Sequence, residues 1–542
     1  MRKRVGTAFV LMMSLIWLAA CASGKNNANS GGSVASSSAT KTTESTDTPP
    51  AEGEFGFPLA EQANLNILAF KASASKIMDY NEYELFKRLE EETNVHINWT
   101  LVDESTKMEK LNLVFASGDY PDAVYGAMPS GIDLTNWANQ GILLPLNDLI
   151  DQYAPNLKAI FEKHPEYKAA ITHSDGKIYA LPKVVDAPFY QAPDTMWINK
   201  KWLDAVNLPV PTTTDELYEA LKAFKGKDLN GNGKQDEIPM SFMYNSNWIG
   251  GNALSGSFGI MDHEGNHSYI MDGKLFYAPQ EEGYKEYVQY MHKLYSEGLL
   301  DKELFTQTAQ VYTSRMQNEV PVLGVASYPI NSYLTNGDEY VPLLGLKGPK
   351  GDYGWKRENP GIWGGAFLLT TANQNPEITM KWVDSHYDLE MSLEIQEGPV
   401  GIGLKKLDNG KYESLPPPEG MDNVAFRFSL APGFNAPNII PSENYSEGIF
   451  ITPRETEELA AFELKEPLLR YGAINALLVY DAEDYEALEQ FSDLNGWNGY
   501  VNTIFADFVI NGLTDEKWEK HLGQLKKLNV DQFLEIHSKY QL

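Results

Sequence analysis

The chain has 542 residues, of which 43% are hydrophobic and 22% are charged, a composition typical of a globular protein. Its formal charge is −30, and no cluster of Lys and Arg follows the N-terminus, which argues against nucleic acid as a partner. The single cysteine excludes an internal disulfide, so stability must come from core packing or from a bound metal.

The N-terminus predicts export. Arg2, Lys3 and Arg4 precede an apolar run over residues 5–20, which is shorter than the roughly 20 residues of a membrane-spanning helix and typical of a signal peptide. The run ends in Leu18-Ala19-Ala20-Cys21, which resembles a lipobox, the site where a cysteine is acylated. Residues 1–20 are therefore predicted to be a signal peptide and Cys21 a lipidation site. The alternative is an ordinary signal peptide followed by chance by Cys.

Residues 21–58 predict a flexible leash, because Ser, Thr, Asn, Gly, Ala and Pro cannot bury enough surface to order the segment. With the acyl group, the leash would hold the folded body at the extracellular face of the cytoplasmic membrane. Without the three basic residues of the signal peptide, the formal charge becomes −33. The body has roughly 480 residues, too many for one core, so two or three domains are expected.

The body begins with alternating strands and helices. Apolar runs at 65–70, 96–102 and 123–126 predict strands, with a helix at 83–92 between the first two. This alternation favours βαβ units and a mostly parallel sheet.

Further elements follow. Residues 196–200 predict a strand, and Thr213 with Glu216 predicts a capping box at the start of a helix reaching Phe224. Apolar stripes predict helices at 284–294, from Pro376 onward and from Thr514 to the C-terminus. The chain contains no internal repeat.

The segment 228–237 has the spacing of a calcium loop. Asp228, Asn230, Asn232 and Asp236 occupy positions one, three, five and nine, with glycine at six, as in the first part of an EF-hand. Position twelve is proline instead of glutamate, so Asp236 or Glu237 would have to supply the closing carboxylate. The alternative is a polar Asn-Gly turn between a helix and a strand.

Enzyme motifs are absent or unconvincing. His263-Glu264-Gly265-Asn266-His267 matches H-E-x-x-H, but a zinc protease needs both histidines on one helix face, whereas Gly265-Asn266 predicts a turn between two strands. The sequence has no nucleophile elbow, no P-loop and no dinucleotide-binding glycine motif. No catalytic residue is predicted.

The segment Ala116-Ser-Gly-Asp-Tyr-Pro-Asp-Ala-Val124 is similar to the ASGDxPDxV segment of family 1 extracellular solute-binding proteins of ABC transporters. Residues 198–204, 211–217, 298–301 and 518–528 resemble further family segments. Within the family, the chain is most similar to the large oligosaccharide-binding lipoproteins, including the alginate-binding type. The resemblance runs from about residue 64 to the end of the chain.

This resemblance implies an α/β fold of two lobes, the type II periplasmic-binding-protein-like fold, with a hinge, a ligand cleft and extra C-terminal helices. The expected N-lobe is 60–185 plus about 320–375, and the expected C-lobe with the helical extension is 186–319 plus about 376–542. For the calcium loop, the resemblance implies a structural Ca²⁺ held by Asp228, Asn230, Asn232, the Lys234 carbonyl, Asp236 and Glu237.

In this fold, loops at the carboxyl ends of strands line the cleft. Asp122 lies in such a loop and is a candidate acceptor for sugar hydroxyls. Trp248, Trp363 and Trp497 lie in glycine-rich segments, and Tyr190 is a further candidate for stacking on a sugar. The alternative is that each tryptophan packs under its own loop.

The sequence therefore predicts a monomeric, lipid-anchored protein without catalytic activity that captures an oligosaccharide for an ABC importer. Two alternatives stay open at this point. One is an extracellular polysaccharide-active enzyme, and the other is a receptor that presents a sugar or a peptide to a membrane sensor.

Overall fold

The structure is a computed structural model that describes residues 56–244, 246, 249–263, 265–358, 361–421, 423–433, 435–474, 480–495 and 499–540. The chain divides into two units, Met1–Glu54 and Phe55–Leu542, and all described residues belong to the second. The predicted signal peptide, Cys21 and nearly all of the predicted leash lie outside the described residues. Among the described helices, none is long and apolar enough to cross a bilayer.

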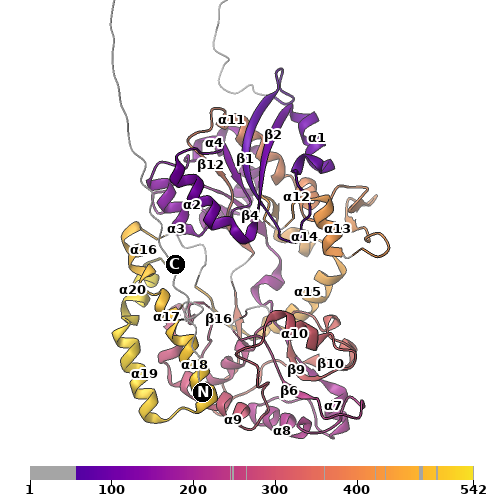
Figure 1. The fold of residues 1–542 in the computed structure, drawn as a ribbon, viewed down its shortest axis with the longest axis vertical. Coiled ribbons are helices and arrows are strands. Elements are labelled where there is room, and N and C mark those ends of the chain that lie inside the picture. The colour runs from indigo at the N-terminus through magenta and orange to yellow at the C-terminus, as the bar shows by residue number, and fades with distance from the viewer. Residues whose placement is uncertain are drawn as a thin grey trace, which may run out of the picture. The chain divides into compact units, whose positions relative to one another are not determined.

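A six-stranded mixed sheet in the order β15-β4-β12-β3-β1-β2 forms the first lobe (Figure 1). Its strands are β1 (Ala63–Lys71), β2 (Val95–Asp103), β3 (Ala123–Tyr125), β4 (Leu181–Val185), β12 (Ile362–Leu369) and β15 (Ile439–Ile440). β2 and β3 run parallel to β1, whereas β12 is antiparallel to both β3 and β4. The predicted βαβ units are confirmed, because a helix connects each successive pair among β1, β2 and β3.

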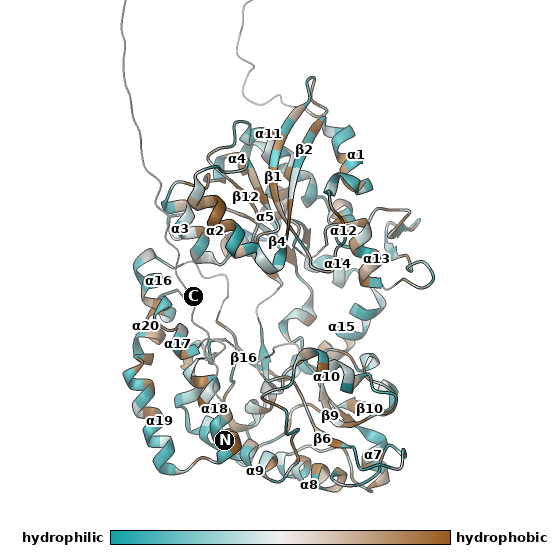
Figure 2. Cartoon of the chain, in the orientation of Figure 1, coloured by the Kyte–Doolittle hydropathy of each residue, from teal (hydrophilic) through white to brown (hydrophobic). Residues whose placement is uncertain are grey.

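Helices cover both faces of this sheet. They are α1 (Glu84–Thr93), α2 (Lys107–Ser117), α3 (Gly131–Asn139), α4 (Asn147–Tyr153), α5 (Pro155–Lys163), α6 (Pro165–Ala170), α11 (Pro376–Asp384) and α12 (Leu389–Glu397). Alternate residues of β1 serve two cores: Leu65 and Ile67 pack with Trp382 of α11, whereas Leu68 packs with Trp137 of α3. Because both faces are buried, the central strands are apolar, as Figure 2 shows.

The second lobe is built on a four-stranded sheet in the order β10-β5-β9-β6. Its strands are β5 (Met196–Asn199), β6 (Ile238–Met240), β9 (Leu323–Ser327) and β10 (Tyr340–Pro342), and its helices are α7 (Lys200–Ala205), α8 (Thr214–Phe224), α9 (Glu282–Ser296) and α10 (Ala309–Met316). Thr213 caps α8 by accepting from the Glu216 N–H, as predicted. The Glu216 carboxylate instead accepts from the N–H of Thr212 at 2.8 Å, so the reciprocal half of the predicted capping box is displaced by one residue.

The remaining described strands form two smaller sheets. One has the order β11-β16-β7-β8 and contains β7 (Ser268–Met271), β8 (Lys274–Tyr277), β11 (Trp355–Arg357) and β16 (Leu469–Gly472). The other is the hairpin of β13 (Leu404–Lys406) and β14 (Tyr412–Ser414).

The C-terminal third is largely helical, and from Thr514 onward this agrees with the sequence prediction. Its helices are α13 (Asn423–Leu430), α14 (Ser442–Ser446), α15 (Pro453–Lys465), α16 (Ala482–Glu489), α17 (Ser492–Asn495), α18 (Tyr500–Asn511), α19 (Asp515–Lys527) and α20 (Val530–Tyr540). Thr514 caps α19, and Leu525 of α19 shares an apolar core with Phe533 and Ile536 of α20. Helices α19 and α20 lie in the segment after Thr514 for which the sequence predicts helix.

Several segments belong to a different sheet from the one that the predicted lobe bounds imply. β9 and β10 fall within the predicted return of the N-lobe near 320–375, but both belong to the second sheet. Conversely, α11, α12 and β15 lie within the predicted C-lobe, but they pack on the first sheet. The sheet membership of these segments thus differs from the predicted lobe bounds, because the sheet on which an element packs depends on tertiary contacts.

Candidate functional site

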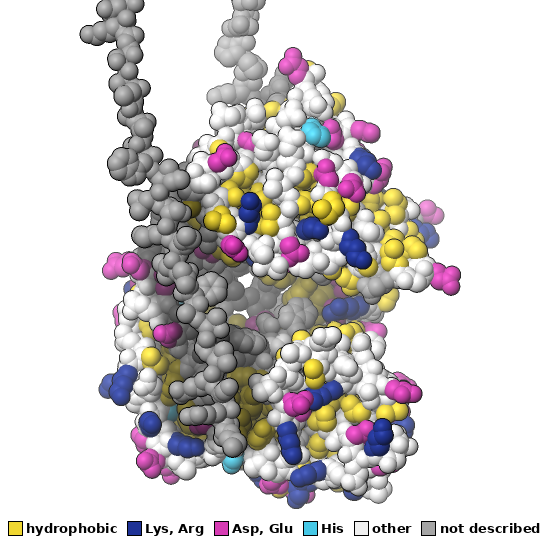
Figure 3. All heavy atoms as spheres, in the orientation of Figure 1, with side chains coloured by type: hydrophobic (Ala, Val, Ile, Leu, Met, Phe, Trp, Pro, Cys, Tyr) yellow, Lys and Arg dark blue, Asp and Glu magenta, His cyan; other side chains and the backbone are white. Residues whose placement is uncertain are grey.

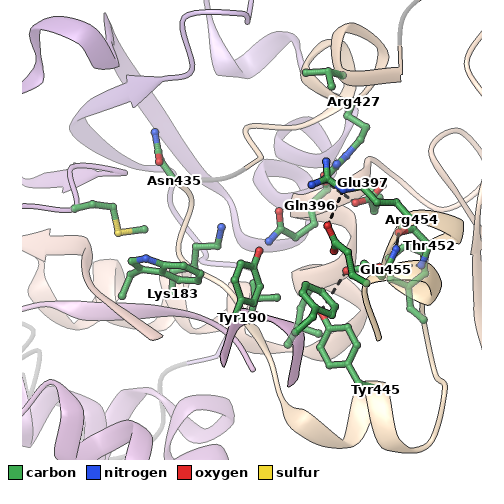
Figure 4. A pocket seen from close by; sticks show the side chains of 18 residues that line it. Lys183, Tyr190, Gln396, Glu397, Arg427, Asn435, Tyr445, Thr452, Arg454 and Glu455 are labelled. Carbon is green, nitrogen blue, oxygen red and sulfur yellow. Dashed lines mark hydrogen bonds and ion pairs between the residues drawn. The ribbon is translucent and has the colours of Figure 1, made fainter. Parts of the chain in front are cut away.

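A cavity of about 550 Å³ lies beside β4 and β12 of the first lobe, within the range of roughly 300–1,000 Å³ typical of small-molecule sites. The lining residues are Met128, Lys183, Val185, Phe189, Tyr190, Trp363, Gln396, Glu397, Val424, Arg427, Asn435, Ile440, Tyr445, Phe450, Thr452, Arg454, Glu455 and Glu458. Figure 4 shows Lys183 and Tyr190 pointing into the same space as Gln396 and Glu455. The cavity thus combines aromatic rings with closely spaced polar groups.

Trp363 on β12 pairs with Lys183 on β4 in the antiparallel ladder. The register shifts between Trp363 and Phe367 around Gly365, which has a φ of +80°. A Cβ atom on Gly365 would lie 2.5 Å from Cδ of Pro129, so this bulge requires glycine. Bulges re-aim neighbouring side chains, which explains why Trp363 is 37% exposed on a strand that is otherwise mostly buried.

Tyr190, in the 3₁₀ helix η3 (Pro188–Gln191), packs edge-on against Trp363. Their ring centroids are 5.5 Å apart and their planes meet at 85°, and we call this pair the aromatic corner. A Cβ atom on Gly361 would lie 2.1 Å from the carbonyl oxygen of Val185 and 3.0 Å from Cδ2 of Tyr190, so glycine permits the close approach. Burial raises the pKa of Tyr190 to about 12, so its hydroxyl stays protonated at neutral pH.

Lys183 adds a cationic group beside the aromatic corner. Its Nζ lies 5.3 Å from the ring centroid of Trp363, and the residue is only 6% exposed. Burial, reinforced by the positive charge of Arg427, lowers the pKa of Lys183 to about 7. Near neutral pH the side chain is therefore a mixture of two forms: an ammonium group, which only donates hydrogen bonds, and a neutral amine, which can also accept one.

An ion pair from α12 and α13 forms a polar wall of the cavity. Arg427 contacts Oε1 of Glu397 at 2.6 Å and donates to the carbonyl oxygen of Gln396 at 2.9 Å. Burial raises the pKa of Glu397 to about 7, against the opposing effect of Arg427. These contacts hold the guanidinium in one orientation at the cavity wall.

The first turn of α15 supplies a second polar wall. Thr452 and Glu455 form a capping box: the Thr452 hydroxyl accepts from the Glu455 N–H at 3.1 Å, and the Glu455 carboxylate accepts from the Thr452 N–H at 2.8 Å. The hydroxyl of Tyr445 donates to Glu455 at 3.4 Å, and Nε of Arg454 donates to Glu458 at 2.9 Å. The start of the helix therefore positions four polar side chains along the cavity wall: Thr452, Arg454, Glu455 and Glu458.

The loop 228–237 connects α8 to β6 in the second lobe. Oε1 of Glu237 accepts from the N–H groups of Leu229 at 2.6 Å and Asn230 at 3.1 Å, and Oδ2 of Asp228 accepts from the Gly233 N–H at 2.9 Å. These bonds, with Gly231 and Gly233 at positive φ, fold the loop into a compact turn.

One feature of the loop 228–237 favours the binding of a hard cation. Oε2 of Glu237 is buried and has no hydrogen-bond partner, and the side chains near it offer oxygen atoms of the kind that Ca²⁺ prefers. Against this, the side-chain amides of Asn230 and Asn232 donate to Asp236 at 3.0–3.1 Å. Across the described residues, no three His, Cys, Asp or Glu side chains are grouped as a metal site.

A model of the bacterial extracellular solute-binding protein family matches residues 75–385, more than half of the chain. The chain belongs to this family. Over 98% of its length it is 30% identical to the fructooligosaccharide ABC transporter substrate-binding protein FusA of Streptococcus pneumoniae serotype 4, covering 97% of that protein. Lipoprotein LipO of Bacillus subtilis is 28% identical to this chain, over 61% of this chain and 65% of the length of LipO.

Solved structures agree with this assignment. FusA of S. pneumoniae in complex with kestose is 31% identical, with a TM-score of 0.76 over 88% of this chain and 98% of that one. A FusA EF-hand mutant in complex with fructo-nystose is 30% identical, with the same TM-score and coverage. Alginate-binding protein AlgQ2 without calcium ion is 22% identical, with a TM-score of 0.66 over 89% of this chain and 98% of that one, which supports the fold alone. The predicted family and two-lobe α/β fold are confirmed.

Within this solute-binding fold, two of the five predicted ligand residues line the cavity, namely Tyr190 and Trp363. Asp122 does not line it, because its Oδ2 accepts from the backbone and the side-chain N–H groups of Asn66 at 2.7 and 3.2 Å and joins the start of β3 to β1. Trp248 and Trp497 lie outside the described residues.

Sequence reasoning missed the charged residues of the cavity. Lys183 is the one charged residue of the strand Leu181–Val185, and an isolated lysine in an apolar strand was the signal that could have marked it. The segment Thr452-Pro-Arg-Glu455 has the sequence pattern of a capping box, which could have marked the start of α15. The two histidines of the H-E-x-x-H motif, His263 and His267, lie in a loop before β7 and not on a helix, which agrees with the prediction that the motif is not a zinc site. The predicted strand before the turn does not form at residues 261–263, and Glu264 lies outside the described residues.

Proposed function

We propose that the chain captures an oligosaccharide in the cavity around Trp363 and delivers it to an ABC importer. The aromatic corner is the observation that carries this proposal. A partly exposed indole with a tyrosine set edge-on beside it offers a flat apolar surface for the C–H face of a sugar ring. The positioned groups of Lys183, Arg427 and Glu455 surround it and suit sugar hydroxyls.

The charges of the cavity favour a neutral glycan. Its lining contains three cationic side chains, Lys183, Arg427 and Arg454, and three carboxyl groups, Glu397, Glu455 and Glu458. The basic excess that a polyanionic glycan requires is therefore missing from the cavity lining. On the face drawn in Figure 3, Lys and Arg are likewise interspersed with Asp and Glu. Fructooligosaccharides, the cargo named for FusA, are neutral and are the first candidates.

We propose that the chain binds its ligand without catalysing a reaction. Glu397 is paired with Arg427, Glu458 is paired with Arg454, and Glu455 caps α15, so each carboxyl group of the cavity has a structural partner. FusA, which is similar along its whole length, is named a substrate-binding protein.

We further propose that the loop 228–237 binds a structural Ca²⁺. The buried free oxygen of Glu237, the carboxylates of Asp228 and Asp236, the amide oxygens of Asn230 and Asn232 and the Lys234 carbonyl are the oxygen donors in the loop. The FusA structure named as an EF-hand mutant supports this assignment. The bound ion would supply two positive charges, which offset most of the charge of the three carboxylates.

For the location, we propose that Cys21 is acylated and that residues 21–58 tether a monomeric body outside the cytoplasmic membrane. The family is extracellular, and LipO is named a lipoprotein.

A thermal-shift screen of the purified chain with calcium present tests the function. Kestose, nystose, an alginate oligomer and a galacturonan oligomer would be compared, and each mixture would then be analysed for products by chromatography. We expect stabilisation by a neutral glycan without its degradation, because a ligand that binds only the native state raises the midpoint. Product formation would establish an enzyme instead, and the absence of any shift would contradict the carbohydrate assignment.

A further inference from the structure

Two tyrosines that do not line the cavity stack on each other in the second lobe. Tyr328 directly follows β9, and Tyr333 ends the 3₁₀ helix η6 (Asn331–Tyr333). Their ring centroids are 4.1 Å apart and their planes differ by 7°. Both rings are half-buried and pack against the edge of an apolar core, so each keeps some solvent exposure.

Hydrogen bonds from two side chains fix the backbone around this tyrosine pair. Nε1 of Trp197 donates to the carbonyl oxygen of Tyr328 at 2.7 Å, and Nδ2 of Asn331 donates to the carbonyl oxygen of Gly337 at 2.9 Å. Offset stacking is one of the arrangements that aromatic rings prefer, and it has near-parallel planes like those of this pair. Because the stacked rings cover one face of each other, a sugar can stack only on an outer face of the pair.

Helix α15 links the tyrosine pair to the cavity. Its first turns line the cavity with Arg454 and Glu458, whereas Ala461, further along the same helix, packs in the apolar core flanked by the tyrosine pair. Ser332, adjacent to Tyr333, donates a hydrogen bond to the carboxylate of Glu457 on the same helix.

The charge of Arg454 acts on a tyrosine at each aromatic site. Burial raises the pKa of Tyr190 and of Tyr328, and in each case the positive charge of Arg454 opposes that rise. The guanidinium is therefore within electrostatic range of a cavity tyrosine and of the tyrosine pair.

We infer that Tyr328 and Tyr333 form a second sugar subsite, which binds the distal units of an oligosaccharide whose first units occupy the aromatic corner. This inference rests on the proposed function. It adds a chain-length selectivity, because short glycans fill the aromatic corner alone and only longer ones reach the tyrosine pair.

Calorimetric titration of the purified chain with sucrose, kestose and nystose tests the inference. We expect Tyr333→Ala to weaken the binding of the longest glycan about threefold to tenfold, the scale of one aromatic contact, and to leave the shortest glycan that binds unchanged. Tyr333→Phe, which keeps the ring, should restore the affinity. Trp363→Ala should weaken binding at every length.

Two outcomes would overturn the inference. If Tyr333→Ala and Tyr328→Ala weaken all lengths equally, or none, while the wild-type chain binds, the second subsite does not exist and the proposed function stands. If the wild-type chain binds none of these glycans, nor any other glycan in the screen, the proposed function fails and the subsite fails with it. Thermal midpoints without ligand identify variants that have lost their fold.

Discussion

Lys183 and Trp363 face each other across the β4–β12 ladder, with Nζ 5.3 Å from the ring centroid, and together they form the inner wall of the cavity. A lysine that is 6% exposed is rare unless it is paired or has a function. The fold therefore keeps a costly buried amine beside the residue that we assign to sugar stacking.

Replacing Lys183 by Met should stabilise the chain in a pH-dependent way. The pKa of Lys183 is about 7 in the folded state, below its ordinary value of 10.5, so between these values the unfolded chain binds the additional proton. The wild-type penalty is therefore complete below about pH 7 and disappears as the pH rises to 10.5. Denaturation midpoints from pH 6 to 10 should show the largest gain for Lys183→Met at the acidic end. A gain independent of pH would contradict the assigned pKa.

Gly365→Ala should destabilise the chain and weaken glycan binding. The substitution places a methyl group 2.5 Å from Pro129 at a φ of +80°, whereas a methyl group added to Gly410, which has a φ of +82°, would meet no atom within 4 Å. Gly410→Ala therefore isolates the cost of backbone strain. We expect Gly365→Ala to be about 1–3 kcal/mol less stable than Gly410→Ala, from overpacking. Chemical denaturation and calorimetry would measure both effects; equal stability of the two variants would argue against a tightly packed bulge.

Thr452→Ala should lower both stability and affinity. Loss of an N-cap costs about 1 kcal/mol and releases Glu455, which the capping box holds at the cavity wall. Thr452→Ser keeps the hydroxyl and serves as the matched control. Affinity that survives while stability falls would show that the start of α15 is not part of the binding site.

Calcium should stabilise the chain through the loop 228–237. At a free concentration 100 times the dissociation constant, binding to the native state adds about 2.7 kcal/mol. Glu237→Gln should abolish the difference in thermal midpoint between calcium and EGTA, whereas Asp408→Asn, at an exposed position outside the loop, should keep it. A calcium-dependent shift that persists in Glu237→Gln would place the metal elsewhere.

Local patterns predicted part of this molecule from sequence. Thr213 at the start of α8 and Thr514 at the start of α19 cap helices with clear apolar stripes, and both helices form as predicted. Tyr190 and Trp363 were recognisable because glycine or proline flanks each of them. In these cases the residues that determine the local structure lie within a few positions of each other in the sequence.

The rest of the site depends on tertiary contacts. Lys183 and Arg427 reach one cavity from positions far apart in the sequence, and the pairing of Arg427 with Glu397 requires α12 and α13 to meet. Asp122 resembled a ligand residue because it ends a loop, but the hydrogen bonds from Asn66 engage it in the sheet. Such partners are not visible in local sequence.

Calorimetric titration of kestose into the wild-type chain and Trp363→Ala tests the central claim most directly, with Leu113→Ala, exposed on α2 away from the cavity, as the control. We predict that the wild type and Leu113→Ala bind alike and that Trp363→Ala binds at least about 30-fold more weakly, the loss of a central aromatic anchor. Equal affinity of Trp363→Ala and the wild type would show that the sugar does not bind at the aromatic corner.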